Sequence, residues 1–123
     1  MSTSISIPHQ HIRSDAGVDG TVRGTLVTNP DGDAHGHLAI AVRDNSRRYR
    51  ALTGSINQNG VHSIQLERVQ TDAGMIELAS LEVKVLGDSR NLCFGKDADI
   101  VLRRIPDNSE LFRATVHLDV EPG

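Results

Sequence analysis

Aromatic side chains are scarce in this chain of 123 residues, which has one tyrosine, two phenylalanines and no tryptophan. They stand at Tyr49, Phe94 and Phe112. Aromatic residues dominate protein-binding hot spots and form the platforms on which nucleic-acid bases stack. The composition therefore argues against a nucleic-acid partner, although it is no obstacle to a core of Val, Ile and Leu.

Cysteines and long apolar runs are also nearly absent. Cys93 is the only cysteine, so the chain cannot form an internal disulfide, and we interpret Cys93 as a small buried hydrophobic residue. The longest uninterrupted apolar stretch, Leu38 to Val42, is far too short to span a bilayer. The N-terminal residues lack the basic and apolar regions of a signal peptide. We therefore expect a cytoplasmic protein that does not contact membranes.

Turn-forming residues recur at intervals of about ten residues, for example at 29–32, 44–46 and 59–60, with runs rich in Val, Ile, Leu and Thr between them. This spacing predicts a single all-β domain over residues 1–123, a sandwich or flattened barrel of about eight or nine mostly antiparallel strands. The expected strands cover residues 3–7, 20–28, 36–43, 48–57, 61–69, 75–86, 91–94, 98–105 and 112–120. The expected long loops cover residues 8–19 and 106–111.

One hairpin can be predicted in register. Asn59-Gly60 is a strong turn signal. A three-residue loop over 58–60 pairs Leu52 with Leu66 and Ile56 with His62, and it collects apolar residues on one face. A two-residue loop would mix apolar and polar residues on both faces. Because register follows the buried pattern, we predict the three-residue loop, with a left-handed Gly60.

The following strand is expected to pair Leu66 with Leu78. Its apolar alternation then changes phase near residue 80, which predicts a β-bulge there. A helix over 72–86 is the alternative. The β-branched valines of this segment favour the strand.

Two His-x-His pairs, His9 with His11 and His35 with His37, are the candidate metal ligands. Residues two apart on a strand share a face, so each pair could point at one zinc or copper ion. A zinc site also needs a third ligand. The available candidates are His62, His117, Asp31 and Asp33. The alternative interpretation is surface histidines near strand ends, and we expect no cofactor.

Four arginines cluster in the sequence around a turn and form the candidate anion or nucleic-acid site. They are Arg43, Arg47, Arg48 and Arg50. Arg103-Arg104 could add to the cluster. Such a patch could meet phosphates or another acidic partner. The alternative is a solvated hairpin tip, which fits the overall net charge of −3 better.

The stretch from Val22-Arg23-Gly24-Thr25-Leu26 to Ala39-Ile40-Ala41-Val42 resembles the opening hairpin of bacterial single-stranded-DNA-binding OB folds. The resemblance is confined to this hairpin, and the stacking aromatics of that family are missing from it. It implies an OB-like nucleic-acid-binding domain as one alternative function.

Motifs that carry catalytic chemistry are missing from the sequence: there is no Gly-x-Ser-x-Gly, no phosphate loop and no Cys-x-x-Cys. We therefore expect a non-enzymatic assembly or interaction module, a homo-oligomer held by strand edges or an apolar sheet face. A metal-binding β-barrel that uses the His-x-His pairs, with or without enzymatic activity, is the other alternative.

Overall fold

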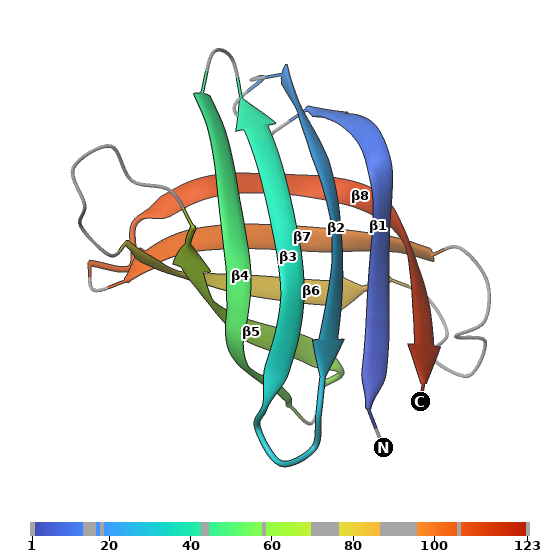
Figure 1. The fold of residues 1–123 in the computed structure, drawn as a ribbon. Helices are drawn as coiled ribbons and strands as arrows, with labels where there is room; N and C mark the ends of the chain where they lie inside the picture. The colour runs from blue at the N-terminus through green and yellow to red at the C-terminus, as the bar shows by residue number, and fades with distance from the viewer. Residues whose placement is uncertain are drawn as a thin grey trace.

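The structure, a computed structural model, describes residues 2–13, 17, 19–42, 45–57, 59–69, 77–86, 96–105 and 107–122. Within these residues the chain contains strands and no helix, and eight antiparallel strands close into a barrel (Figure 1). The strands are β1 (Thr3–Arg13), β2 (Asp19–Thr28), β3 (Ala34–Val42), β4 (Asn45–Ile56), β5 (Val61–Arg68), β6 (Leu78–Val85), β7 (Lys96–Ile105) and β8 (Glu110–Pro122). The predicted all-β class is confirmed, and the barrel is the architecture found.

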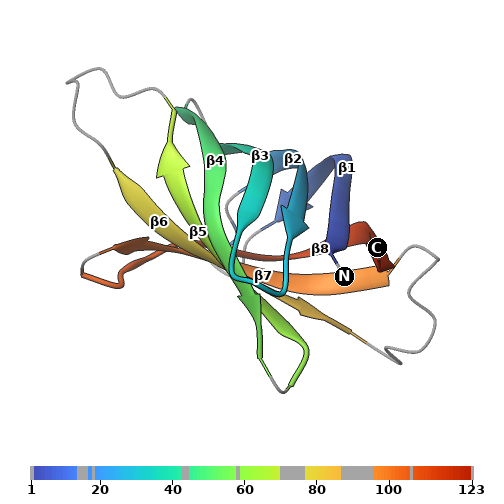
Figure 2. The same cartoon turned by 60° about the horizontal axis from the view of Figure 1, so that its bottom comes forward.

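Each strand pairs with the next along the chain, and β8 returns to pair with β1. This closing pair joins Thr3 to Pro122 and Ser6 to Asp119, so the two ends of the described chain lie side by side (Figures 1 and 2). Strands β1 to β4 form one wall of the barrel, and β6 to β8 cross behind it. Closure gives every strand two neighbours, although the β1–β8 ladder covers only Thr3 to Ser6 of β1. Assembly through strand edges or an apolar sheet face stays a prediction.

Aliphatic side chains at alternating strand positions fill the barrel interior. On β6, Ala79, Leu81 and Val83 are completely buried. Glu82 and Lys84, at the alternate positions, face solvent. The inward positions of β8 continue the same contiguous core and are Phe112, Ala114, Val116, Leu118 and Val120. An eight-stranded barrel is just wide enough to be filled by side chains, and this pattern of period two fills it.

The predicted β4–β5 hairpin is correct near its turn and wrong further along. Ile56 pairs with His62 as predicted, and Gly60 has a φ of 77°. The register then shifts between Ala51 and Thr53, so that Ala51 pairs with Leu66 and Leu52 stands in the bulge. The prediction that Leu52 faces Leu66 is therefore wrong, because the alternation alone did not reveal a bulge that bends β4 around the barrel.

The change of phase predicted in the next strand is also wrong. Leu66 pairs with Ala79 rather than with Leu78, and the β5–β6 ladder runs without a register shift. Ala79 begins the inward alternation, and Leu78 is only half buried. The prediction relied on large apolar residues, so it did not recognise the small Ala79 as an inward position. Residues 78–85 form a strand, which rejects the helix there.

Strand β1 extends to Arg13, so the loop expected over 8–19 is wrong for residues 8–13. The ladder with β2 shifts between Ile7 and Gln10, which accommodates Pro8 without requiring its missing N–H. Ile12 then returns to the core. The strand expected over 91–94 and Cys93 lie outside the described residues.

The seam between β1 and β8 is completed by a side chain. Backbone pairing of these strands ends at Ser6, because β1 bulges directly afterwards. The side-chain amide of Gln10 then donates to the carbonyl oxygen of His117 at 2.6 Å and accepts the His117 N–H at 2.8 Å. Gln10 therefore replaces the backbone partner that the bulge removes.

No helix long and apolar enough to cross a bilayer occurs in the part of the chain that the structure describes.

Candidate functional site

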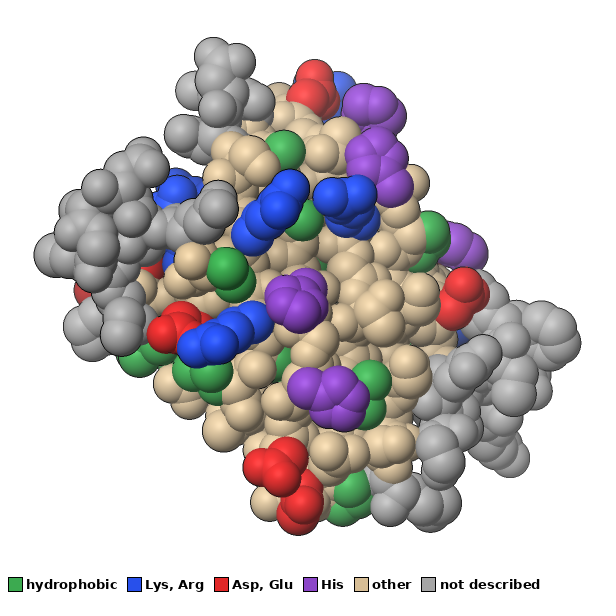
Figure 3. Space-filling view, viewed as in Figure 1, with side chains coloured by type: hydrophobic (Ala, Val, Ile, Leu, Met, Phe, Trp, Pro, Cys, Tyr) green, Lys and Arg blue, Asp and Glu red, His purple; other side chains and the backbone are tan. Residues whose placement is uncertain are grey.

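A shallow hollow of about 980 Å³ lies on the outer face of β1 to β4. We define this outer hollow by its polar lining residues, which are Ser6, Arg23, Thr25, His35, His37 and Arg48. Basic and imidazole side chains gather on this face, with acidic side chains at its lower end (Figure 3). The outer hollow is the concave polar surface from which we interpret function.

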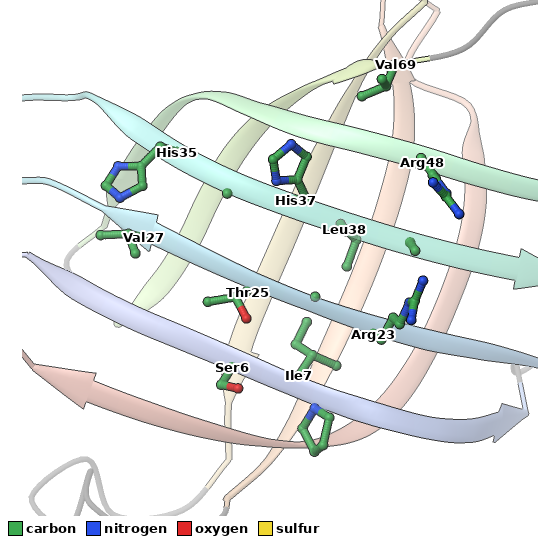
Figure 4. A pocket seen from close by; sticks show the side chains of 14 residues that line it. Ser6, Ile7, Arg23, Thr25, Val27, His35, His37, Leu38, Arg48 and Val69 are labelled. Carbon is green, nitrogen blue, oxygen red and sulfur yellow. The ribbon is translucent and has the colours of Figure 1, made fainter.

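Strand pairing brings the two arginines of the outer hollow together. Ala39 on β3 pairs with Arg23 on one side and with Arg48 on the other. Cross-strand partners share a face of the sheet, and the small Ala39 side chain leaves space between the guanidinium groups. Figure 4 shows both arginines at one end of the hollow, with His37 and His35 following along β3.

Between the two histidines, Gly36 lets β3 approach β2 closely. Its φ is 122°, and a Cβ atom there would clash with the carbonyl oxygen of Thr25. A side chain is therefore excluded by backbone sterics. This glycine permits the close β2–β3 pairing that sets the floor of the hollow.

The charges of this face are arranged unevenly along the strands. Arg23 and Arg48 form no ion pair with any described residue, whereas Arg50 is bound to Glu67 through a 2.6 Å hydrogen bond from its Nε. Asp33 continues the outward positions of β3 beyond His35, at the opposite end from the arginines. The face is therefore cationic at one end and anionic at the other.

The four histidines proposed as metal ligands occupy two separate places on the barrel. His35 and His37 lie side by side in the outer hollow. His9 and His11 form an edge-to-face pair on β1, with ring centroids 6.5 Å apart. Among the described residues, no group of three or more His, Cys, Asp or Glu side chains is placed to hold a metal ion.

The additional ligand candidates are not brought to either pair as a third ligand. His62 is buried inside the barrel. His117 lies on β8, where its Nδ1 is 3.3 Å from a carboxylate oxygen of Asp97. The arrangement therefore gives no specific support to zinc or copper.

The arginine cluster seen in the sequence is divided between the two sides of the barrel wall. Residues 47–50 lie inside β4, where successive side chains alternate. Arg48 and Arg50 point outward, while Arg47 pairs with the buried Ile40 and points inward. Arg43 lies outside the described residues. Two of the four positions thus share the outer face, and one of these, Arg50, already has an acidic partner.

Sequence reasoning missed Arg23 and Thr25 as members of this surface. They are distant in sequence from the arginines of β4, and only the β2–β3–β4 register places them beside Arg48 and His37. The alternation of β2 predicted which of its side chains face outward. It did not predict which strands would lie beside β2.

Chemically, the outer hollow offers guanidinium, imidazole and hydroxyl groups, which suit carboxylate or phosphate acceptors. No protein-family model matches the chain, and neither curated proteins nor solved structures include a similar protein.

Proposed function

We propose that the protein is a non-enzymatic assembly module that forms a homodimer through the outer hollow. The observation that supports this proposal is the polarity of the face. Arg23 and Arg48 lie at one end and form no ion pair with the described residues. Beyond the other end of the hollow, Asp33 precedes β3 and Asp31 lies in the β2–β3 turn. A second copy, turned end for end, supplies the complementary charges.

The geometry of β3 makes such a face self-complementary. Asp33 and Ala39 are roughly 20 Å apart along the strand, at about 3.3 Å per residue. A two-fold axis near Gly36, halfway between them, would place the arginines of each copy against the carboxylates of the other. Each contact then occurs twice, as two-fold interfaces require.

A second copy fits this surface better than a nucleic acid. The lining of the outer hollow contains no Phe, Tyr or Trp side chain on which a base could stack. The carboxylates at its far end would also repel a phosphate backbone. The OB-like alternative therefore receives no support from this face.

Charge reversal tests the proposed dimer. Native protein is expected to elute as a dimer in size exclusion with light scattering. The double variant Arg23→Glu, Arg48→Glu and the single variant Asp33→Lys should each weaken the dimer at least tenfold, because like charges then face each other. An equal mixture of the two variants should restore it. Asp31 is left unchanged because its carboxylate accepts the Asp33 N–H at 3.1 Å.

Lys84→Glu is the matched control, since Lys84 is an exposed residue on the opposite wall. It should leave the dimer unchanged. A native protein that stays monomeric at the highest soluble concentration would refute the proposal. A native dimer that both reversals leave intact would locate the interface elsewhere.

The compartment that we propose for this module is the cytoplasm. A chain whose single cysteine cannot form an internal disulfide suits a reducing environment.

A further inference from the structure

A second polar site lies at one end of the barrel, where the inward positions of β4, β5 and β7 are occupied by arginines. Arg47 on β4 pairs with buried Ile40, and Arg68 on β5 pairs with buried Tyr49. Arg104 on β7 pairs with buried Ala79. Cross-strand partners share a face, so all three guanidinium groups belong to the interior side. We name this group, together with Tyr49 and Glu77, the barrel mouth.

One carboxylate lies among the three guanidinium groups. Glu77 accepts a 2.9 Å hydrogen bond from Nη1 of Arg68, and its other oxygen is 3.9 Å from Nε of Arg104. Arg47 makes no ion pair with a described residue. The carboxylate of Asp107 also lies near Arg104 and interacts with its charge. Among the described residues the barrel mouth therefore keeps an excess of positive charge.

Tyr49 forms the floor of the barrel mouth. It is completely buried, and its O–H has no hydrogen-bond acceptor among the described residues. Burial raises the pKa of this hydroxyl, Arg47 lowers it through its charge and a side-chain hydrogen bond, and Glu77 raises it. Tyr49 also pairs across the strands with Arg68, which puts both side chains on the inner face of the sheet. Because a guanidinium can only donate, Arg47 cannot accept the Tyr49 proton.

A second buried donor is also left unused. Nε of Arg68 is buried without a hydrogen-bond partner. The unsatisfied groups of the barrel mouth are thus an O–H and an N–H donor, while its carboxylate is engaged by arginines. Buried donors without partners are costly, so a ligand made of acceptor oxygens would relieve this arrangement.

We propose that the barrel mouth binds a phosphate-class dianion, held by Arg47, Arg68 and Arg104, with the Tyr49 hydroxyl donating to one of its oxygens. Three guanidinium groups match the several oxygens of a phosphoryl group, and charged hydrogen bonds of this kind are strong. The side chain of Arg104 is 46% exposed, so this arginine can be reached from solvent.

The protein carries its own reporter for this site. Tyr49 is the only tyrosine and there is no tryptophan, so the ultraviolet emission of the protein comes from Tyr49. Inorganic phosphate, titrated at constant ionic strength, should quench this emission in a saturable manner, because a phosphate oxygen accepts a hydrogen bond from the phenolic O–H. It should also raise the Tm, as a ligand of the folded state does.

Adjacent arginines provide the matched variants. Arg47→Gln and Arg104→Gln should each weaken phosphate binding at least about tenfold. Arg48→Gln removes the same charge from the outer side of the wall and should leave binding unchanged. This contrast separates the site from the general stabilisation of proteins by phosphate. It also distinguishes phosphate binding at the barrel mouth from the proposed dimer. Arg48→Gln should weaken the dimer, and Arg47→Gln should not.

Tyr49→Phe gives a second readout that does not depend on the arginines. Without phosphate, it should keep or raise the Tm, because it removes an unsatisfied buried hydroxyl. With phosphate, its Tm should rise less than that of the native protein. A purely structural hydroxyl would give the first result but not the second, so the smaller rise with phosphate is the decisive measurement.

Two further anions define the ligand. Acetate, a monoanion, should produce little quenching at the same ionic strength. Glycerol 3-phosphate tests whether a phosphoryl group is recognised when carried on an organic molecule, and binding at least as tight as that of inorganic phosphate would assign the site to phosphate esters. Weaker binding would assign it to free phosphate. Equal effects of acetate and phosphate, or equal responses of Arg47→Gln and Arg48→Gln, would overturn the proposal.

Discussion

At the scale of single residues, His62 makes the stability of the barrel core depend on pH. It is 95% buried at the start of β5, and its Nδ1 has no hydrogen-bond partner. Burial lowers the pKa of His62 below its ordinary value of 6.5, because the charged imidazolium is poorly solvated inside the barrel. The folded protein therefore keeps His62 neutral at pH values where the unfolded chain already binds a proton.

This difference predicts acid sensitivity with a definite sign. The stability that depends on neutral His62 is complete above pH 6.5 and is lost as the pH falls from there toward the lower folded pKa. The free energy of unfolding, measured by urea titration between about pH 7.5 and 5.5, should fall less in His62→Leu than in the native protein. His9→Leu, at an exposed position of β1, is the control and should retain the native pH dependence. An unchanged pH dependence in His62→Leu would contradict the assignment.

At the scale of elements, the weakest part of the barrel is the seam between β1 and β8. It lies between strands at opposite ends of the chain, and backbone pairing covers only Thr3 to Ser6 of β1. The two hydrogen bonds between Gln10 and the backbone of His117 extend it. Closure of the barrel thus depends on one side-chain amide beyond the last backbone pair.

Removal of this amide should loosen the seam. Gln10→Ala is expected to cost about 1–2 kcal/mol of unfolding free energy, since the two hydrogen bonds to His117 and one to the Pro8 carbonyl oxygen are lost at a partly exposed position. Gln65→Ala should cost less than about 0.5 kcal/mol, because the Gln65 side chain has only a long 3.4 Å contact with Thr53. Hydrogen exchange of the His117 amide should accelerate in Gln10→Ala alone. Equal stability losses in the two variants would mean that Gln10 does not support closure.

At the scale of the whole molecule, the barrel has one contiguous apolar core to which all eight strands contribute. No group of strands retains a core of its own if the barrel opens, because each wall packs its inward side chains against the other. The chain should therefore unfold as one unit.

The single tyrosine allows a direct test of this cooperativity. Emission of Tyr49, which lies in the wall formed by β1 to β4, should change at the same urea concentration as the far-ultraviolet circular dichroism of all strands. Coincident transitions at one protein concentration are expected of a two-state domain. A Tyr49 transition at lower urea would show that this wall opens separately.

Much of the strand content was predictable because it depends on local pattern. Alternation identified Leu81 and Val83 as inward and Glu82 and Lys84 as outward, and the turn residues located the hairpin at Gly60. The bulges were not predicted. The register shift at Leu52 depends on the curvature of the closed sheet and not on the residues next to Leu52 in the sequence. The same limit applied to Pro8, which suggested a loop where β1 continues through a bulge.

Local sequence pattern predicts a chain of strands with a largely aliphatic core. The pairing of β8 with β1, the position of Arg23 beside Arg48 and the orientation of Arg47 toward the other side of the wall emerge only in the folded barrel. The physical reason is that side-chain alternation is a local property of the backbone. Strand closure and the neighbours across a sheet depend on pairings between distant segments, which are stabilised only when the whole core is assembled.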